Sequence, residues 1–245
     1  MTATSLGESA PSSNPALGDQ SFLLRQTMVD CQVRTFDVID QRLLQQMLDV
    51  PREDFLPASL APLAYSDKVL TLVPTTPGTA PRSLLPPLIL ARLLQGAGVR
   101  PTDRVLDVAP ALGYSTALLA GLAKDVSALE CEAEWVAAMG GAFATHGLKN
   151  VSVFQGPLAG GVPSKAPFDL IVINGAVMAH LETALDQLVE GGRLVAFHYE
   201  QNDPTRRAGK AVRFEKIGGD ISRRVLFDAS LPVLDAFAEP ERFTF

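Results

Sequence analysis

The chain has 245 residues, of which 47% are hydrophobic and 20% charged, and its formal net charge is -6. This composition fits a globular protein, and the length is enough for one large α/β domain with a smaller addition. The acidic balance argues against nucleic acid as the main partner, because phosphate binding needs a basic surface. No apolar run approaches the roughly 18 residues that a membrane-spanning helix needs.

Residues 1–20 have neither a basic start nor an apolar centre, so we expect a disordered tail rather than a secretory signal. The two cysteines, Cys31 and Cys131, do not suggest a disulfide framework, and a reducing cytoplasm is the simplest location. The three histidines are far apart, and neither HExxH nor CxxC occurs, so no metal site is predicted.

Residues 21–100 form the expected N-terminal helical and substrate-loop segment. Apolar residues recur at helical spacing over 22–35, and Asp40 is placed to cap a second helix, QRLLQQMLDV, which Pro51 ends. VLTLV at 69–73 predicts a short strand, and the turn-forming run PTTPGTAPRS at 74–83 predicts an exposed loop. A further helix begins near Pro87 and ends at the glycines of 96–98.

Residues 101–200 alternate between short apolar strands and helices. The predicted strands are RVLDVA, VSALE, NVSVFQ, FDLIVING and RLVAFHY, and the predicted helices are STALLAGLA, AEWVAAMGGAFATHG and HLETALDQLVEGG. This order predicts a doubly wound α/β fold, with a mostly parallel Rossmann-like sheet covered on both faces. Residues 201–245 complete the sheet with a β-hairpin around Gly218 and Gly219, followed by a tail.

The turn after the first strand of this core is the expected ligand site, because doubly wound sheets bind ligands beyond the carboxyl ends of their strands. Asp107 lies near the end of that strand, and Gly113 opens the following helix. Glu130 ends the next strand, where a carboxylate can accept hydrogen bonds from both hydroxyls of a ribose; the alternative is a solvated strand end. A carboxylate on the apolar strand VLDV is costly unless it orders a loop or meets a ligand.

Several stretches of the chain resemble the protein-L-isoaspartate O-methyltransferases, which use S-adenosylmethionine. The resemblance runs from about Met28 to the C-terminus. The matching stretches include VPREDFLP at 50–57, LAYSD at 63–67, VLDV with GYS, APFDLIVINGAV at 166–177 and LVEGGRLVAF at 188–197. The last part of the chain, Leu226 to Phe237, is similar to a bacterial branch whose C-terminus reads LFDA-PVL-F.

The resemblance implies a fold of the class I methyltransferase type and a protein or peptide substrate that carries isoaspartate. A carboxylate oxygen of that substrate attacks the methyl group of the cofactor, and the ester then cyclises to a succinimide. The reaction needs alignment and exclusion of water rather than a general base. The expected cofactor-binding residues are Asp107, Ala109, Ala111, Gly113, Tyr114, Glu130 and Asn174. For Tyr114 the alternative is a side chain that fills a gap in the packing, and for Asn174 it is an amide that caps a loop.

The cofactor turn departs from the family's approximate pattern DVGxGxGY. Ala109 and Ala111 stand where the first two glycines would be, and Pro110 between them has no N–H to donate. If each alanine has a positive φ, each costs roughly 1 kcal/mol. The sequence therefore predicts a weakened cofactor site, unless the turn follows a different, relaxed path.

Two other departures concern the substrate and the adenine. Leu85 replaces the serine of the family's Thr-x-Ser-x-Pro element, which leaves Ser83 and Arg82 as candidates for holding the substrate carboxylate. For Arg82 the alternative is a solvated loop charge. Gly156-Pro157 stands where the family has a glycine–aspartate pair, so the acid that would contact the adenine amine is missing, and the amide of Gln155 is the one candidate to substitute for it.

Three hypotheses follow. The first is an S-adenosylmethionine-dependent methyltransferase acting on isoaspartyl carboxylates. The second is a catalytically inactive protein of methyltransferase fold that serves as a binding or assembly module, which the altered turn and substrate element favour. The third is a methyltransferase for another small carboxylate or hydroxyl substrate.

Overall fold

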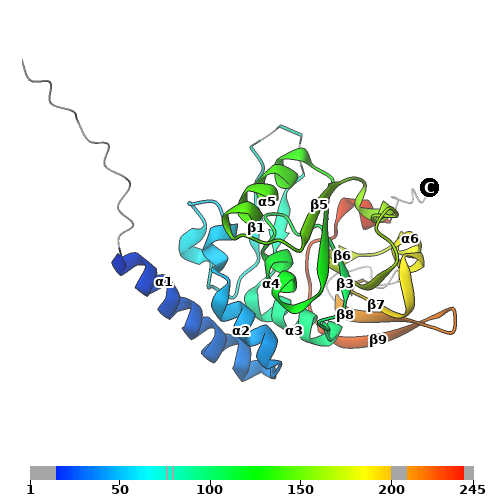
Figure 1. Ribbon diagram of the computed structural model, residues 1–245, viewed down its shortest axis with the longest axis horizontal. Helices are drawn as coiled ribbons and strands as arrows, with labels where there is room; N and C mark the ends of the chain where they lie inside the picture. The colour runs from blue at the N-terminus through cyan, green and yellow to red at the C-terminus, as the bar shows by residue number, and fades with distance from the viewer. Residues whose placement is uncertain (1–14, 76, 79, 200–208, 240–245) are drawn as a thin grey trace, which may run out of the picture.

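The computed structural model of the chain describes residues 15–75, 77, 78, 80–199 and 209–239. Figure 1 shows a central sheet with helices packed along one side and a long N-terminal helix at the edge of the molecule. The α-helices are α1 (Pro15–Thr27), α2 (Gln41–Asp49), α3 (Pro87–Ala97), α4 (Tyr114–Leu122), α5 (Ala133–Thr145) and α6 (Glu182–Asp186). Among the described residues, no helix is long and apolar enough to cross a membrane.

The main sheet has seven strands in the order β5-β4-β3-β6-β7-β8-β9. Its strands are β3 (Arg104–Val108), β4 (Asp125–Glu130), β5 (Val151–Gln155), β6 (Phe168–Val177), β7 (Leu188–His198), β8 (Lys210–Ile217) and β9 (Asp220–Asp228). β3 to β7 are parallel, whereas β8 and β9 run antiparallel and form the expected hairpin. The predicted doubly wound, mostly parallel sheet is confirmed. A second sheet pairs β1 (Leu70–Leu72) with β2 (Arg82–Leu84).

The two faces of the main sheet are covered unequally. Alternate strand residues such as Val105, Val126 and Val195 join one apolar cluster with residues of α2, α3, α4 and α5. Their neighbours, such as Leu106 and Leu194, join a second cluster, which α6 and short turns of 3-10 helix cover. The period of two along each strand produces this division.

The structure differs from the predicted elements at three places. Residues 15–20 of the expected tail lie in α1, and residues 1–14 lie outside the described part of the chain. The expected exposed loop at 74–83 ends in β2, where Arg82 is 6% exposed. The expected helix at 180–192 is only α6, because Leu188 already pairs with Phe168 as part of β7.

The N-terminal segment follows its sequence signals closely. The carboxylate of Asp40 accepts hydrogen bonds from the backbone N–H groups of Arg42 and Leu43, at 3.0 and 3.2 Å, and so caps α2 as predicted. Before that, residues 22–35 are helical but change from α to a π-helical turn at Met28–Val33.

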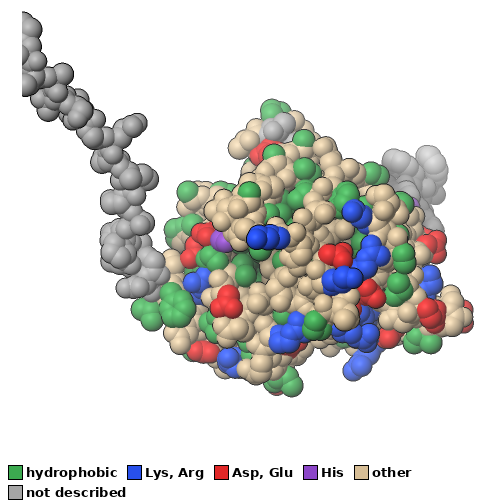
Figure 2. Space-filling view, viewed as in Figure 1, with side chains coloured by type: hydrophobic (Ala, Val, Ile, Leu, Met, Phe, Trp, Pro, Cys, Tyr) green, Lys and Arg blue, Asp and Glu red, His purple; other side chains and the backbone are tan. Residues whose placement is uncertain are grey.

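The surface carries charges of both signs. Figure 2 shows acidic and basic side chains interspersed over the visible face of the molecule.

Candidate functional site

The candidate site lies where the order of the sheet reverses. β3 is flanked by β4 on one side and by β6 on the other, so the chain moves outward in opposite directions from this point. The turn at 109–113 leaves the carboxyl end of β3 here, and Asp107, Glu130 and Asn174 belong to the three strands that meet. Residues far apart in the chain are therefore brought to the position where such sheets bind ligands.

The backbone of the turn keeps a left-handed path at three positions. Ala109 and Ala111 each have φ 56°, and Gly113 has φ 91°. Alanine in this region costs roughly 1–2 kcal/mol at each position. The turn has therefore not relaxed to another path, and it retains the conformation that glycines normally adopt.

The methyl groups of the two alanines are buried rather than projecting into open space. Ala109 packs into the second core cluster, and Ala111 packs against Leu72 of β1 and Trp135 of α5. These contacts offset part of the conformational cost of the two residues.

Asp107 is fully buried and held by three side chains. It accepts hydrogen bonds from Ser115, Thr116 and Asn174 at 2.8, 2.7 and 2.6 Å. Burial raises the pKa of Asp107 to about 6, although the three hydrogen bonds oppose the shift. Asp107 thus orders the end of β3 and fixes the amide of Asn174, whose nitrogen also donates to the Val108 carbonyl at 3.1 Å.

Glu130 is fully buried at the end of β4, and its carboxylate is already hydrogen-bonded. It forms an ion pair with Arg82, whose Nη2 lies 3.0 Å from Oε2 and whose Nε lies 3.2 Å from both oxygens. The backbone N–H groups of Ala111 and Cys131 donate to the same carboxylate, at 3.0 and 3.2 Å. A carboxylate has about four acceptor positions, so this one is saturated by the protein.

Arg82 is therefore neither a solvated loop charge nor free to bind a ligand in this structure. Its expected bidentate partner is a carboxylate, but the carboxylate belongs to Glu130. Burial lowers the pKa of Arg82, but the hydrogen bond and negative charge of Glu130 overbalance this effect and raise it. The sequence indicated Arg82 and Glu130 as candidates for two different ligands, and the fold joins them.

The β1–β2 hairpin, which comprises residues 70–75, 77, 78 and 80–84 of the described chain, lies over the turn and is attached to it at several points. Leu72 contributes the apolar contact with Ala111 and Trp135, and Arg82 contributes the ion pair. The indole Nε1 of Trp135 donates to the Ala80 carbonyl at 3.3 Å. Thr75 donates to Glu134 of α5 through its backbone N–H at 2.8 Å. The hairpin thus closes over the face of the turn on which Glu130 lies.

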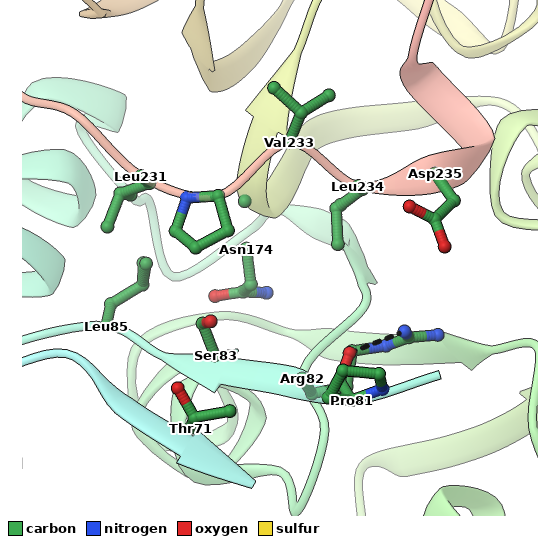
Figure 3. Close-up of a pocket in the computed structure, with 12 residues that line it drawn as sticks. Thr71, Pro81, Arg82, Ser83, Leu85, Asn174, Leu231, Val233, Leu234 and Asp235 are labelled. Carbon is green, nitrogen blue, oxygen red and sulfur yellow. Dashed lines mark hydrogen bonds between the residues drawn. The ribbon is translucent and has the colours of Figure 1, made fainter. Parts of the chain in front are cut away.

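A cavity of about 230 Å³ lies on the other side of the hairpin, between β1–β2 and the C-terminal segment 231–235. Figure 3 shows Thr71 and Ser83 on the hairpin side, Leu231 and Leu234 opposite them, and Asn174 between. Thr71 and Ser83 are partners in the β1–β2 register, so two hydroxyl groups enter the cavity side by side. Leu85, at the position of the family's serine, lines the same cavity with an apolar side chain.

Thr71 and the segment 231–235 were not predicted as site residues. The pairing of VLTLV with the strand around Ser83 could have indicated Thr71, but the turn-rich loop between them concealed it. The segment 231–235 reaches the site by a parallel bridge between Ala176 and Val233, a long-range contact that local pattern does not reveal.

Tyr114 takes the second of its two expected roles and fills space in the packing. Its side chain is fully buried in the helical layer, where its ring centroid is 5.9 Å from that of Phe55 and 4.8 Å from the guanidinium carbon of Arg52. Burial raises its pKa to about 12. The side chain therefore does not face the turn, and the expected contact with a cofactor is not available to it in this arrangement. Tyr114 is the first residue of α4, and the ring packs with the buried side chains of the helical layer.

Two further observations complete the site. Gln155 is exposed next to Glu130 in the sheet, and its amide donates to the Cys131 carbonyl at 3.3 Å. Within the described ranges, no group of three or more His, Cys, Asp and Glu side chains is placed to hold a metal ion.

Known proteins resemble this chain in both sequence and structure. The profile of the family described as protein-L-isoaspartate(D-aspartate) O-methyltransferase matches residues 25–224. A protein-L-isoaspartate O-methyltransferase of Koribacter versatilis is 38% identical over 172 residues, covering 70% of this chain and 74% of the relative. One from Bordetella parapertussis is 36% identical over 189 residues, covering 76% and 70%.

Two solved structures share the fold over most of the chain. A protein-L-isoaspartate O-methyltransferase superposes with a TM-score of 0.70 at 23% identity, covering 88% of this chain and 65% of the other. A Plasmodium falciparum structure, described as a β-aspartate methyltransferase in complex with S-adenosyl-L-homocysteine, superposes with a TM-score of 0.68 at 18% identity, covering 88% and 98%.

Proposed function

The chain belongs to the protein-L-isoaspartate(D-aspartate) O-methyltransferase family, and from this we propose that it transfers a methyl group from S-adenosylmethionine to isoaspartyl carboxylates of proteins or peptides. The observation that carries the proposal is the left-handed turn at 109–113, which is kept at the switch point of the sheet although two of its residues are alanine. A cavity for a second reactant opens beside it.

The residues present fit the cofactor in part. The turn has the backbone path that a nucleoside cofactor needs, and Asp107 and Asn174 hold its shape. Glu130 has the residue type and the position for a ribose, but its acceptors are used by Arg82 and two backbone N–H groups. Pro110 supplies no N–H to the turn. The backbone of the turn therefore fits the cofactor, whereas Glu130 can accept hydrogen bonds from a ribose only if Arg82 moves away from it.

When bound, the cofactor supplies a methyl group on a positively charged sulfur. The chain's own residues then have two tasks, which are alignment and exclusion of water. The hydroxyl groups of Thr71 and Ser83 are donors that can hold a carboxylate in the cavity. Leu85, Leu231 and Leu234 line the same cavity with apolar surface, so a carboxylate placed there loses water and becomes a better nucleophile. No general base is needed, because the carboxylate is already ionised near neutral pH.

The relatives favour an enzyme over a non-catalytic binding module. Each of the four proteins compared with the chain is named as a methyltransferase, and the Plasmodium falciparum structure is described with the cofactor product bound. We place the reaction in the cytoplasm, where Cys31 and Cys131, which are unpaired, would stay reduced.

The direct test is methyl transfer from labelled S-adenosylmethionine to a peptide with isoaspartate, compared with the same peptide containing ordinary aspartate. We expect a base-labile methyl ester on the isoaspartyl peptide alone. Incorporation into neither peptide by a chain that binds S-adenosylhomocysteine would leave the cofactor assignment standing and exclude this substrate class.

The substrate cavity has its own test. Ser83→Ala should raise the KM for the isoaspartyl peptide about five- to tenfold, because one hydrogen bond to a charged group is lost. Ser222→Ala, on the exposed strand β9, is the matched control and should leave KM unchanged. An unchanged KM in Ser83→Ala would remove Ser83 from carboxylate recognition.

A further inference from the structure

We propose that Arg82 is an internal occupant of the cofactor site, which must leave Glu130 when a ribose binds and then pairs with the substrate carboxylate. This inference rests on the proposed function and assigns Arg82 two successive partners. Three observations carry it, namely the saturated carboxylate of Glu130, the attachment of the hairpin over the turn, and the place of Arg82 beside the cavity.

The first step is competition for Glu130. The two oxygens of this carboxylate receive three contacts from the Arg82 guanidinium in addition to two backbone N–H groups. The backbone donors are fixed by the turn and by the end of β4. Only the arginine side chain can withdraw, so a ribose diol can reach Glu130 only in its place.

The second step follows from charge. A diol is neutral, so exchanging it for the guanidinium leaves Arg82 without its counter-ion in a place where it is only 6% exposed. A buried unpaired cation is strongly unfavourable, and another anion is needed. Arg82 also lines the cavity that contains Thr71 and Ser83, so a substrate carboxylate in that cavity is the nearest replacement. The arginine thus exchanges one carboxylate for another.

The hairpin supplies the movable element. Beyond the ion pair with Glu130, the described residues of the hairpin are attached to α5 by the packing of Leu72 on Trp135 and by hydrogen bonds. The Trp135 indole donates to the Ala80 carbonyl, and the backbone N–H and the hydroxyl of Thr75 both donate to Glu134. These are modest contacts that a small displacement would break. Trp135 is the single tryptophan of the chain, so its fluorescence reports directly on this contact.

The test compares S-adenosylhomocysteine with an analogue that lacks both ribose hydroxyls, using calorimetric Kd values. Arg82→Gln should bind S-adenosylhomocysteine at least tenfold more tightly than the wild type, because the competitor is gone. The gain should vanish for the analogue. Arg34→Gln, which removes an exposed ion pair with Asp30, is the matched control and should bind as the wild type does.

Arg82→Gln loses a buried ion pair, so its folding must be checked by urea unfolding, and Arg82→Lys provides a milder variant that keeps the charge. In the wild type itself, S-adenosylhomocysteine should shift the Trp135 emission to the red and the analogue should not. A Kd in Arg82→Gln equal to or weaker than that of the wild type would overturn the competition. So would a gain that persists with the analogue.

The second step is tested by kinetics at saturating cofactor. Arg82→Gln should raise the KM for an isoaspartyl peptide at least fivefold, with a smaller increase in Arg82→Lys. An unchanged KM in both would overturn the exchange of carboxylates. If neither the wild type nor Arg82→Gln binds S-adenosylhomocysteine, both the proposed function and the role of Arg82 are wrong. If both bind it tightly and equally, only the competition between Arg82 and the ribose is wrong.

Discussion

Gly113 is constrained twice, by its own backbone and by its neighbour. Its φ of 91° lies in the region that side chains avoid, and a Cβ at this position would lie 2.5 Å from the ring of Phe143. Gly147 has a similar backbone, with φ 62°, but a Cβ there would meet no neighbouring atom within 4 Å. Substituting each of these two glycines with alanine therefore distinguishes the free-energy cost of a left-handed backbone from the cost of overpacking.

Gly113→Ala should lower the free energy of unfolding by about 2–4 kcal/mol, because left-handed strain and overpacking add. Gly147→Ala should cost about 1 kcal/mol from conformation alone. Urea unfolding of both variants measures the difference. Equal losses in the two would mean that Phe143 moves aside at little cost.

Asp107 makes stability depend on pH in a direction opposite to that of most carboxylates. Its pKa is about 6 in the folded protein against an ordinary 3.8, so the folded state holds the proton longer than the unfolded state. Its unfavourable contribution is absent below about pH 4, grows as pH rises, and is complete above about pH 6.

Asp107→Asn removes this titration. Relative to the wild type, the variant should gain about 2–3 kcal/mol of unfolding free energy between pH 4 and pH 6.5, whatever its absolute stability. Urea unfolding over this range measures the slope. A constant difference between the two proteins would show that Asp107 titrates normally.

The β1–β2 hairpin is the element that joins the turn at 109–113 to the cavity lined by Thr71 and Ser83. Leu72 faces Trp135 and Ala111, whereas Leu70, two residues earlier on the same strand, packs into the main core. The same truncation on one strand therefore tests two different contacts.

Leu72→Ala should shift the Trp135 emission to the red, because the indole loses its apolar cover. Leu70→Ala should leave the emission unchanged while costing about 2–5 kcal/mol of stability, as a buried leucine does. A red shift of equal size in both variants would mean that the hairpin loosens as a whole.

How far the elements could be predicted depended on whether their signals were local. The strands of the main sheet and the Asp40 cap were predicted correctly, because period and capping residues lie within a few positions. The helix expected at 180–192 was wrong because sheet pairing begins at Leu188 and converts its second half to β7.

The site was predictable in position but not in its contacts. Asp107, Glu130 and Asn174 do meet at the end of the sheet, as their places on three strands implied. The ion pair of Arg82 with Glu130 could not be foreseen, since 48 residues separate the two and the loop before Arg82 is rich in turn-forming proline and glycine. Pairing of this kind depends on the folded path, and no sequence pattern encodes it.

At the scale of the whole molecule, Arg193 ties distant segments together. It forms a buried ion pair with Asp103 and donates to the carbonyls of Ala97, Gly98 and Asp169, at 2.7, 2.6 and 3.0 Å. The end of α3, the start of β3, and β6 are thereby fixed to β7.

Arg193→Met should cost about 3–5 kcal/mol of unfolding free energy, because it leaves Asp103 buried and unpaired. Adding Asp103→Leu should recover a large part of this loss, which would identify the stranded charge as its cause. Arg34→Met, at an exposed ion pair, should change stability by less than about 1 kcal/mol. A double variant less stable than Arg193→Met would show that lost hydrogen bonds dominate.

β9 closes one side of the main sheet, and within the described residues it pairs only with β8. A strand in this position offers backbone groups that can recruit a strand from another copy, and its exposed Ile221 and Val225 would favour such growth. Arg223 and Arg224 lie on the same strand, so two copies that approach there repel each other. Concentrated salt screens that repulsion, and pairing of two copies through this edge should then become detectable as a dimer in solution.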